Sequence, residues 1–273
     1  MNDAAIAESK NYPEIELRFQ DAEQKNDLQI NQVRLLMRQG IDLLIISPNE
    51  AAPLTPVVQE VFKSGIPVIV LDRAIIGDAY TCFIGADNRE IGRRAGEYVA
   101  KLLNGKGLIV EIKGLPGSPP AIDRSEGFRE VIAKFPDLKI IHNPVANWLR
   151  SEAIDQMKIA LQAQPHIDVV YGHNDPMALG AYLAAKQVGR EKEMKFIGID
   201  ALVNEGVQAV ITGELNATFW YPTCGKDAID TAVKILHKES VPKLIKLETA
   251  LITKENAQEW MDKLKGASVS QGG

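Results

Sequence analysis

Acids, amides and an arginine repeatedly follow the short apolar runs of this sequence. These polar run ends are Asn49, Glu50, Asp72, Arg73, Asp87, Asn88, Asn174, Asp175, Asp200 and Tyr221. Carboxylates accept hydrogen bonds, amides donate and accept them, and a guanidinium donates them in a planar fork. A ligand with several hydroxyl groups needs this mixture, because each hydroxyl both donates and accepts. The residue types therefore indicate a binding site for a polyhydroxylated ligand.

Some of these residues have a structural alternative, because Asn and Asp also cap helix N-termini. Asn49, Asn88 and Asp175 each precede a predicted helix, and capping explains them as well as ligand binding does. Asn174 occupies a similar position, but here we favour ligand contact. Only the tertiary structure can separate the two roles.

Other candidates are better explained by a ligand. Asp72 and Asp200 end apolar strands, where a carboxylate has no structural role, and Arg73 can pair with Asp72 and still reach a ligand. Arg124 lies where a loop opens onto a helix; its alternative is a solvated surface arginine. Trp148 follows a strand in a polar loop, where its ring can stack on the C–H face of a sugar or anchor a core.

No catalytic or cofactor motif accompanies these residues. The sequence contains no G-x-G-x-x-G after a strand, no Walker loop, no C-x-x-C, no H-E-x-x-H and no G-x-S-x-G, and its histidines lack metal-ligand spacing. Asp72 and Asp200 could imitate a glycosidase pair, but they are expected on separate lobes without an apolar pocket. We therefore expect no enzyme, no cofactor and no metal.

Apolar, β-branched runs alternate with amphipathic stretches along almost the whole chain. Strands with no wet face, separated by helices, predict an α/β fold with parallel sheets covered on both sides. The net charge of −5 argues weakly against a nucleic-acid partner. No apolar run reaches the roughly 18–20 residues of a membrane span. We favour two buried free thiols, Cys82 and Cys224, over a disulfide.

An internal repeat predicts two lobes. The strand at 42–46, its helix and the strand ending in Asp72 recur about 125 residues later as the strand at 168–171, its helix and the strand ending in Asp200. We assign residues 1–104 plus 222–244 to the N-terminal lobe and 105–221 plus 245–265 to the C-terminal lobe. Residues 266–273 are expected to form a disordered tail. Three crossovers, near Asn104, 221–222 and 244–247, would form the hinge.

Several motifs, in this order, resemble the ribose/galactose class of type I periplasmic sugar-binding proteins across nearly the whole chain. They are GIPVIVLDR at 65–73, IGADN at 84–88, DRSEGF at 123–128, NDPMALGA at 174–181 and IGID at 197–200. The resemblance implies two Rossmann-like lobes that close by a hinge on a small sugar. It implies a first-lobe hydroxyl clamp of Asp72 and Arg73, second-lobe contacts from Arg124, Asn174 and Asp200, and a stacking ring at Trp148. Tyr221 falls where ribose binders carry glutamine, so the resemblance does not identify which sugar is bound.

The segment TFWYPTCGK at 218–226 looks more like the periplasmic sensor domain of a hybrid two-component histidine kinase than like a transport protein, and residues 47–54 show the same resemblance. The expected partner is a membrane permease or a histidine-kinase module, for uptake or for sensing, and the expected location is the periplasm. Two alternatives are the ligand domain of a LacI-type regulator, which would be cytoplasmic, and an enzyme.

The family opens with a mid-sheet strand, whereas Met1 here falls within the first helix. We therefore expect this chain to be a fragment of a longer, exported protein.

Overall fold

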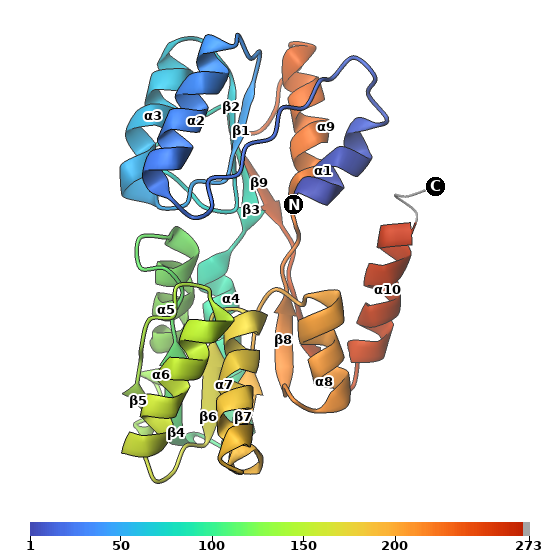
Figure 1. Cartoon of the computed structure of the whole chain (residues 1–273). Coiled ribbons are helices and arrows are strands. Elements are labelled where there is room, and N and C mark those ends of the chain that lie inside the picture. Colours follow the sequence, from blue (N-terminus) through green and yellow to red (C-terminus); the bar gives the residue numbers. More distant parts are fainter. Residues whose placement is uncertain (270–273) are drawn as a thin grey trace.

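The computed structural model describes residues 1–269, which form two α/β lobes stacked on one another (Figure 1). One lobe contains a four-stranded sheet in the order β1-β2-β3-β9, and the other a six-stranded sheet in the order β10-β8-β7-β6-β4-β5. All neighbouring strands are parallel except β10 and β8. The predicted fold of two lobes with parallel sheets is confirmed.

The first lobe is built on strands that helices cover from both sides. All four residues of β2 are buried, as expected for a strand with no wet face. Leu54 and Val58 of α3 pack on one face of the sheet, and Ala228 and Ala232 of α9 pack on the other. The elements are α1 (Asn2–Ser9), α2 (Asn26–Arg38), β1 (Leu44–Ile46), α3 (Ala51–Lys63), β2 (Val68–Leu71), β3 (Cys82–Ala86), α9 (Gly225–Leu236) and β9 (Leu244–Leu247).

The second lobe repeats this arrangement around a larger sheet. Ile91 of α4 and Phe128 of α5 pack on one face, and Met157 of α6 and Met177 of α7 pack on the other. The elements are α4 (Asn88–Leu102), β4 (Lys106–Ile112), α5 (Pro119–Ile132), β5 (Asp137–His142), α6 (Arg150–Ala163), β6 (Val169–Gly172), α7 (Asp175–Gln187), η1 (Glu191–Glu193), β7 (Lys195–Ile197), η2 (Val203–Val207), α8 (Gln208–Thr212), β8 (Ala217–Trp220), β10 (Ala250–Thr253) and α10 (Ala257–Val269).

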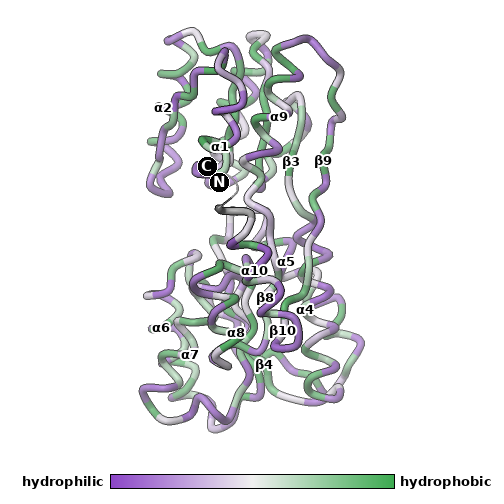
Figure 2. Tube along the Cα trace, turned by 90° about the vertical axis from the view of Figure 1, so that its right-hand side faces the viewer, coloured by the Kyte–Doolittle hydropathy of each residue, from purple (hydrophilic) through white to green (hydrophobic). Residues whose placement is uncertain are grey.

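The first lobe boundary differs from the prediction at residues 104/105. α4 belongs to the second lobe, because its apolar face, with Ile91, Ala95 and Val99, packs against Phe128 in the core of the six-stranded sheet. The chain therefore crosses between the lobes at Asp87, directly after β3. Figure 2 shows the same division from the side, with β3, α9 and β9 in one lobe and α4, β8 and β10 in the other.

The other two crossovers lie close to their predicted positions. The second occupies 221–224, between β8 and α9. The third lies at 248–249 rather than 244–247, because β9 pairs with β3 in the first sheet and β10 pairs with β8 in the second. Three connections therefore join the lobes, as expected for a hinge.

Three smaller expectations concern the C-terminal tail, the two cysteines and a membrane-spanning helix. The tail predicted at 266–273 is not disordered at its start, because α10 continues to Val269. Residues 270–273 lie outside the described part of the chain. Cys82 and Cys224 are both free and buried, as favoured. Within residues 1–269, no helix has the length and apolar character needed to cross a bilayer.

Candidate functional site

The predicted polar run ends gather where the carboxyl ends of the two sheets face each other. Asp72 follows β2 in the first lobe, and Tyr221 follows β8 at the second crossover. The Tyr221 hydroxyl donates a hydrogen bond to Asp72 Oδ1 at 2.6 Å. Asp200 is the third residue after β7, and its Oδ1 lies 3.7 Å from Arg124, whose guanidinium lies 5.2 Å from the centre of the Tyr221 ring. Contacts through Tyr221 and Arg124 therefore connect Asp72 of the first lobe with Asp200 of the second.

A hydrogen-bonded chain links this contact to the second lobe. Asn88 Nδ2 donates to the Tyr221 hydroxyl at 3.4 Å, and Arg124 Nε donates to Asn88 Oδ1 at 2.8 Å. Arg124 also donates to the carbonyl of His173 and lies 3.7 Å from Asp200 Oδ1. Only 4% of the Arg124 side chain is exposed. A buried guanidinium needs such partners, so the surface alternative for Arg124 is wrong.

Arg73 is held in place by its own lobe. Its Nε lies 3.7 Å from Asp72 Oδ2, and its NH1 donates to the backbone oxygen of Asn49 at 3.1 Å. The Asn49 amide in turn donates to the carbonyl of Gln24 at 3.0 Å and to Asn26 Oδ1 at 2.9 Å. Asn49 is therefore neither the cap of α3, whose N-cap residue is Glu50, nor a free ligand group. It positions Arg73.

Trp148 lies close to both arginines. The guanidinium carbons of Arg73 and Arg124 are 5.8 and 5.7 Å from the centre of its ring, within the range of cation–π contact. A Cβ on Gly114 would lie 2.2 Å from the ring, so only glycine leaves space for this orientation. The buried Nε1 of Trp148 has no hydrogen-bond partner within residues 1–269. The ring thus belongs to the polar cluster.

Asn174 has the structural role that was weighed against ligand contact. Its Oδ1 accepts from the backbone N–H of Met177 at 2.9 Å and caps α7. Its Nδ2 donates to the carbonyl of Trp148 at 3.2 Å. Both ends of the amide are in use, and Asn174 holds the Trp148 loop against α7.

Backbone strain is concentrated in these residues. Asp72, Trp148 and Asp200 have φ angles of 59°, 70° and 109°, and Asn147 and Ala201 beside them are also positive. Residues with a Cβ rarely adopt such angles, and each costs of order 1–3 kcal/mol. Strained residues of this kind tend to mark functional sites. Here they direct the side chains that end β2 and follow β7.

The electrostatics of the cluster centre on Asp200. Burial raises the pKa of Asp200 to about 7, Arg124 opposes this shift and Asp72 adds to it. Burial also raises the pKa of the Tyr221 hydroxyl well above its usual range, and the neighbouring charge of Asp72 acts in the same direction. Tyr221 therefore stays protonated and remains a donor to Asp72.

A buried acid supports the strained turn at Asp200. Asp175 accepts from the Thr218 hydroxyl at 2.6 Å and from the backbone N–H of Leu202 at 2.9 Å. Burial, with the charge of Asp200 as a second cause, raises the pKa of Asp175 well above its usual range. Asp175 is not the N-cap of α7. It fixes the turn that carries Asp200.

A second support lies behind Arg124. Glu111 is fully buried, and its carboxylate contacts His173 Nε2 at 3.2 Å and Arg129 at 2.7 Å. Burial lowers the pKa of His173, which favours its neutral form. The neutral ring accepts from the N–H of Gly114 at 3.4 Å through Nδ1 and donates to Glu111 through Nε2. This fixes the His173 backbone, whose carbonyl holds Arg124.

Asn88 is the member of the cluster that sequence reasoning considered but did not select as a ligand contact. It was as well explained by a helix cap as by a ligand, but Asp87 caps α4, with its side chain 2.9 Å from the Glu90 N–H. Its position in the IGADN motif was a usable signal. The structure brings Asp72, Arg73, Arg124, Trp148, Asp200 and Tyr221 into one connected cluster, in which Asn88 joins Tyr221 to Arg124, and it gives Asn49 and Asn174 supporting contacts. Within residues 1–269, no group of three His, Cys, Asp or Glu could hold a metal ion.

This arrangement can hold a polar ligand between two lobes. The lobes also touch through their backbones, since the Ala51 N–H donates to the carbonyl of Gly117 at 3.0 Å. Carboxylates and guanidinium groups from both lobes, together with the Trp148 ring, form one connected cluster at this boundary. Residues of these types can hydrogen-bond hydroxyl groups and stack on a ring face.

Comparison with known proteins supports this assignment. The chain is 34% identical over 262 residues to the galactofuranose-binding protein YtfQ of Escherichia coli, covering 92% of this chain and 82% of that protein. It superimposes with a TM-score of 0.97 and 46% identity on the fructose-binding periplasmic domain of a hybrid two-component system, covering 99% of this chain and 91% of that one.

A third relative has the same fold at lower identity. It is the periplasmic component of an arabinose ABC transporter from Shewanella sp. ANA-3, solved with L-arabinofuranose, with a TM-score of 0.92, 32% identity, and 99% and 92% of the two chains covered. The family model of the periplasmic binding protein domain matches residues 1–240. With this match over most of its length, two lobes of parallel sheet and a polar cluster between them, the chain belongs to the periplasmic binding protein domain family.

Proposed function

We propose that this protein binds a monosaccharide in its furanose form between the two lobes and catalyses no reaction. The observation that carries the proposal is the chain Asp72–Tyr221–Asn88–Arg124, with Asp200 beside it, which crosses from one lobe to the other. It supplies acceptors and donors to hydroxyl groups from two sides. Furanose sugars are favoured because relatives are named for galactofuranose and were solved with arabinofuranose and fucofuranose.

The side chains divide the work of binding. Asp72 Oδ1 is already bonded to Tyr221, so Oδ2, beside Arg73, is the oxygen that accepts from a sugar hydroxyl. Asp200 accepts on the opposite lobe, and Arg73 and Arg124 donate to sugar oxygens. Trp148 provides the face on which the C–H side of the ring stacks. Hydrogen bonds from both lobes then favour the closed form.

Lobe closure gives the protein its output. A ligand that contacts both lobes shifts the population toward the closed form by its differential affinity for the two forms. A permease or the remainder of a histidine kinase can read this change. The named relatives include both transport proteins and a sensor domain, and we place this protein in the periplasm. The same relatives do not favour the LacI-type regulator.

Isothermal titration calorimetry against D-fructose, D-galactose, L-arabinose, D-ribose and myo-inositol tests the proposal. We expect one of the furanose-forming sugars to bind at micromolar affinity, about −8 kcal/mol, and to be recovered unchanged. Absence of binding to every sugar, or turnover of the bound one, would refute it.

Asp72→Ala is expected to weaken the binding by about 1–3 kcal/mol, because a sugar hydroxyl loses its acceptor. Asp155 of α6, whose side chain is 74% exposed and lies near Lys158 of the same helix, provides the control Asp155→Ala. Equal affinities for the wild type and Asp72→Ala would remove Asp72 from the site.

A further inference from the structure

The two lobes also touch at a point outside the polar cluster. The N–H of Ala51, in the first lobe, donates to the carbonyl of Gly117, in the second lobe, at 3.0 Å. Ala51 begins α3, and Gly117 lies in the loop between β4 and α5. The Glu50 side chain covers the same glycine, because an ideal Cβ on Gly117 would lie 1.9 Å from Glu50 Oε2. We call Glu50, Ala51 and Gly117 the edge contact.

The order of strands in the sheets places the edge contact on the side opposite the hinge. In the first sheet, β1 leads to Ala51 and lies at the edge farthest from β9. In the second sheet, β8 and β10 adjoin crossovers at one end of the order, and β4 lies near the other end. Figure 1 accordingly shows α3 and α5 on the left, with β8 and β9 to the right of them.

This position determines what happens to the edge contact when the lobes separate. A rotation of one lobe about the hinge moves each atom in proportion to its distance from the axis. Opening therefore separates Ala51 from Gly117 farther than it separates Asp72 from Tyr221, which follows β8 at the second crossover. The hydrogen bond of the edge contact can exist only when closure is complete.

Helix α3 gains a backbone partner through this bond. The first N–H groups of an α-helix have no partner within the helix. Glu50 is the N-cap residue of α3, but its side chain makes no capping hydrogen bond within the described residues 1–269. The carbonyl of Gly117 supplies an acceptor from the other lobe, and its negative end faces the positive end of the helix dipole. Closure therefore satisfies a donor of the first lobe with an acceptor of the second.

The Glu50 side chain is held from within its own lobe. Asn26 Nδ2 donates to Glu50 Oε1 at 2.6 Å, and Asn26 Oδ1 accepts from the Asn49 amide at 2.9 Å. Asn49 in turn accepts from Arg73 through its backbone oxygen. The edge contact is therefore connected to the first-lobe arginine of the polar cluster.

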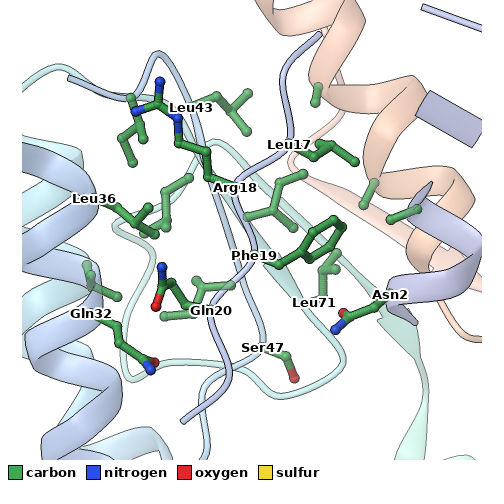
Figure 3. A pocket seen from close by; sticks show the side chains of 18 of the residues that line it. Asn2, Leu17, Arg18, Phe19, Gln20, Gln32, Leu36, Leu43, Ser47 and Leu71 are labelled. Carbon is green, nitrogen blue, oxygen red and sulfur yellow. The ribbon is translucent and has the colours of Figure 1, made fainter. Parts of the chain in front are cut away.

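The loop that carries Glu50 is anchored at its base. Gln29 of α2 donates to the carbonyl of Ser47 at 2.9 Å and accepts from the N–H of Asn49 at 2.8 Å. Figure 3 shows Ser47 at the border of a hollow inside the first lobe, which Gln32 of the same helix also lines. These bonds fix the start of α3 to α2, so Glu50 and Ala51 move with the first lobe.

We propose that the edge contact acts as a latch on the closed form and that Gly117 and Ala51 tune sugar affinity from outside the polar cluster. This inference rests on the proposed binding of a sugar by lobe closure. The bond between the two backbones favours the closed form, and the apparent affinity for a ligand rises with the fraction of protein in the binding-competent form. Glycine is required at 117 because a side chain there collides with Glu50.

Ala51→Pro tests the backbone bond. Proline is tolerated at the first position of a helix, and Glu50 has the extended backbone that suits a residue before proline, with φ −135° and ψ 147°. The variant keeps α3, removes the donor and places a ring carbon against the carbonyl of Gly117. We expect the sugar Kd to rise at least about threefold, as for the loss of one hydrogen bond.

Ala51→Ser is the matched control, because it keeps the N–H at the same position. Its sugar Kd should stay within about twofold of the wild type, since the bond to Gly117 remains. Circular dichroism should show equal helix content in the wild type and both variants, so that a weaker affinity does not reflect the loss of α3. An Ala51→Pro variant with intact helices and wild-type affinity overturns the proposal.

A double-mutant cycle tests the glycine. Gly117→Ala places a Cβ against the Glu50 carboxylate and is expected to raise the sugar Kd at least about threefold. Glu50→Ala removes the colliding group, so the double variant should bind more tightly than Gly117→Ala alone. Wild-type affinity in Gly117→Ala, or no recovery in the double variant, overturns the role of Gly117.

A distance measurement between the lobes reads closure directly. Spin labels at Lys63→Cys, beside the end of α3, and Lys134→Cys, beyond α5, attach to exposed positions, whereas the native Cys82 and Cys224 are buried. At saturating sugar, electron–electron double resonance should give one short distance for the labelled protein and for its Ala51→Ser form, and a longer or broader one for its Ala51→Pro form.

The outcomes separate this inference from the proposed function. A wild type that binds no sugar refutes the proposed function, and the latch with it. A wild type that binds sugar and closes, together with an Ala51→Pro variant that closes to the same distance with the same Kd, refutes the latch alone.

Discussion

Tyr221→Phe isolates the contact that joins the two lobes. The Tyr221 hydroxyl donates to Asp72 at 2.6 Å and accepts from Asn88 at 3.4 Å. The substitution removes this hydroxyl and keeps the ring, over which the Arg124 guanidinium lies 5.2 Å from the centroid. The shape of the site is therefore preserved while the hydrogen-bonded chain loses one member.

The size of the effect follows from the charge of the acceptor. A hydrogen bond to an ionised group contributes about 1.5–3 kcal/mol. Asp72 belongs to the first lobe, whereas Tyr221 packs with the core of the second, so this contact stabilises the closed arrangement. Since about 1.4 kcal/mol changes an equilibrium constant tenfold, we expect the sugar Kd to rise by about 10- to 150-fold.

Calorimetry with the sugar identified for the wild type measures this change, and the chain offers a matched control. Tyr12 also donates to an aspartate, Asp230, at 3.0 Å, but within the first lobe. Tyr12→Phe should leave the sugar Kd within about twofold of the wild type. Tyr221→Phe binding within threefold of the wild type, or equal losses in both variants, would refute the reasoning.

Two further predictions concern stability. Because the pKa of Asp200 is about 7 in the folded chain against an ordinary 3.8, the folded chain holds a proton that the unfolded chain loses, and this contribution to the free energy of unfolding falls as the pH rises from about 4 to about 7. Between about pH 5 and pH 8, urea unfolding should therefore show a smaller decline in the free energy of unfolding for Asp200→Asn than for the wild type or the control Asp155→Asn. Identical declines in all three proteins would contradict this prediction. Gly114→Ala places a Cβ 2.2 Å from the Trp148 ring and should lower the free energy of unfolding by about 1–3 kcal/mol and weaken sugar binding. The control Gly266→Ala, with no atom within 4 Å of its new Cβ, should do neither. A Gly114→Ala variant with wild-type stability and wild-type affinity would argue against the role of the Trp148 ring.

The sequence by itself determined the fold class, and it located the acids and the arginine that follow the apolar strands. Apolar, β-branched runs such as Val68–Leu71 are typical of strands buried on both faces, which need helices on both sides of a parallel sheet. In such sheets the carboxyl ends of the strands share one edge. This is why Asp72, Arg73 and Asp200, chosen because they follow apolar runs, lie in the same cluster.

Tertiary structure alone decided which lobe α4 joins and what each amide does. Tyr221 and Asp72 are 149 positions apart, and their contact depends on how three crossovers place one lobe on the other. Asn49, Asn88 and Asn174 all precede helices, so local sequence describes them alike, although one positions Arg73, one links Arg124 to Tyr221 and one caps α7. The role of each of these side chains depends on contacts with residues distant in sequence, and the local sequence does not reveal those contacts.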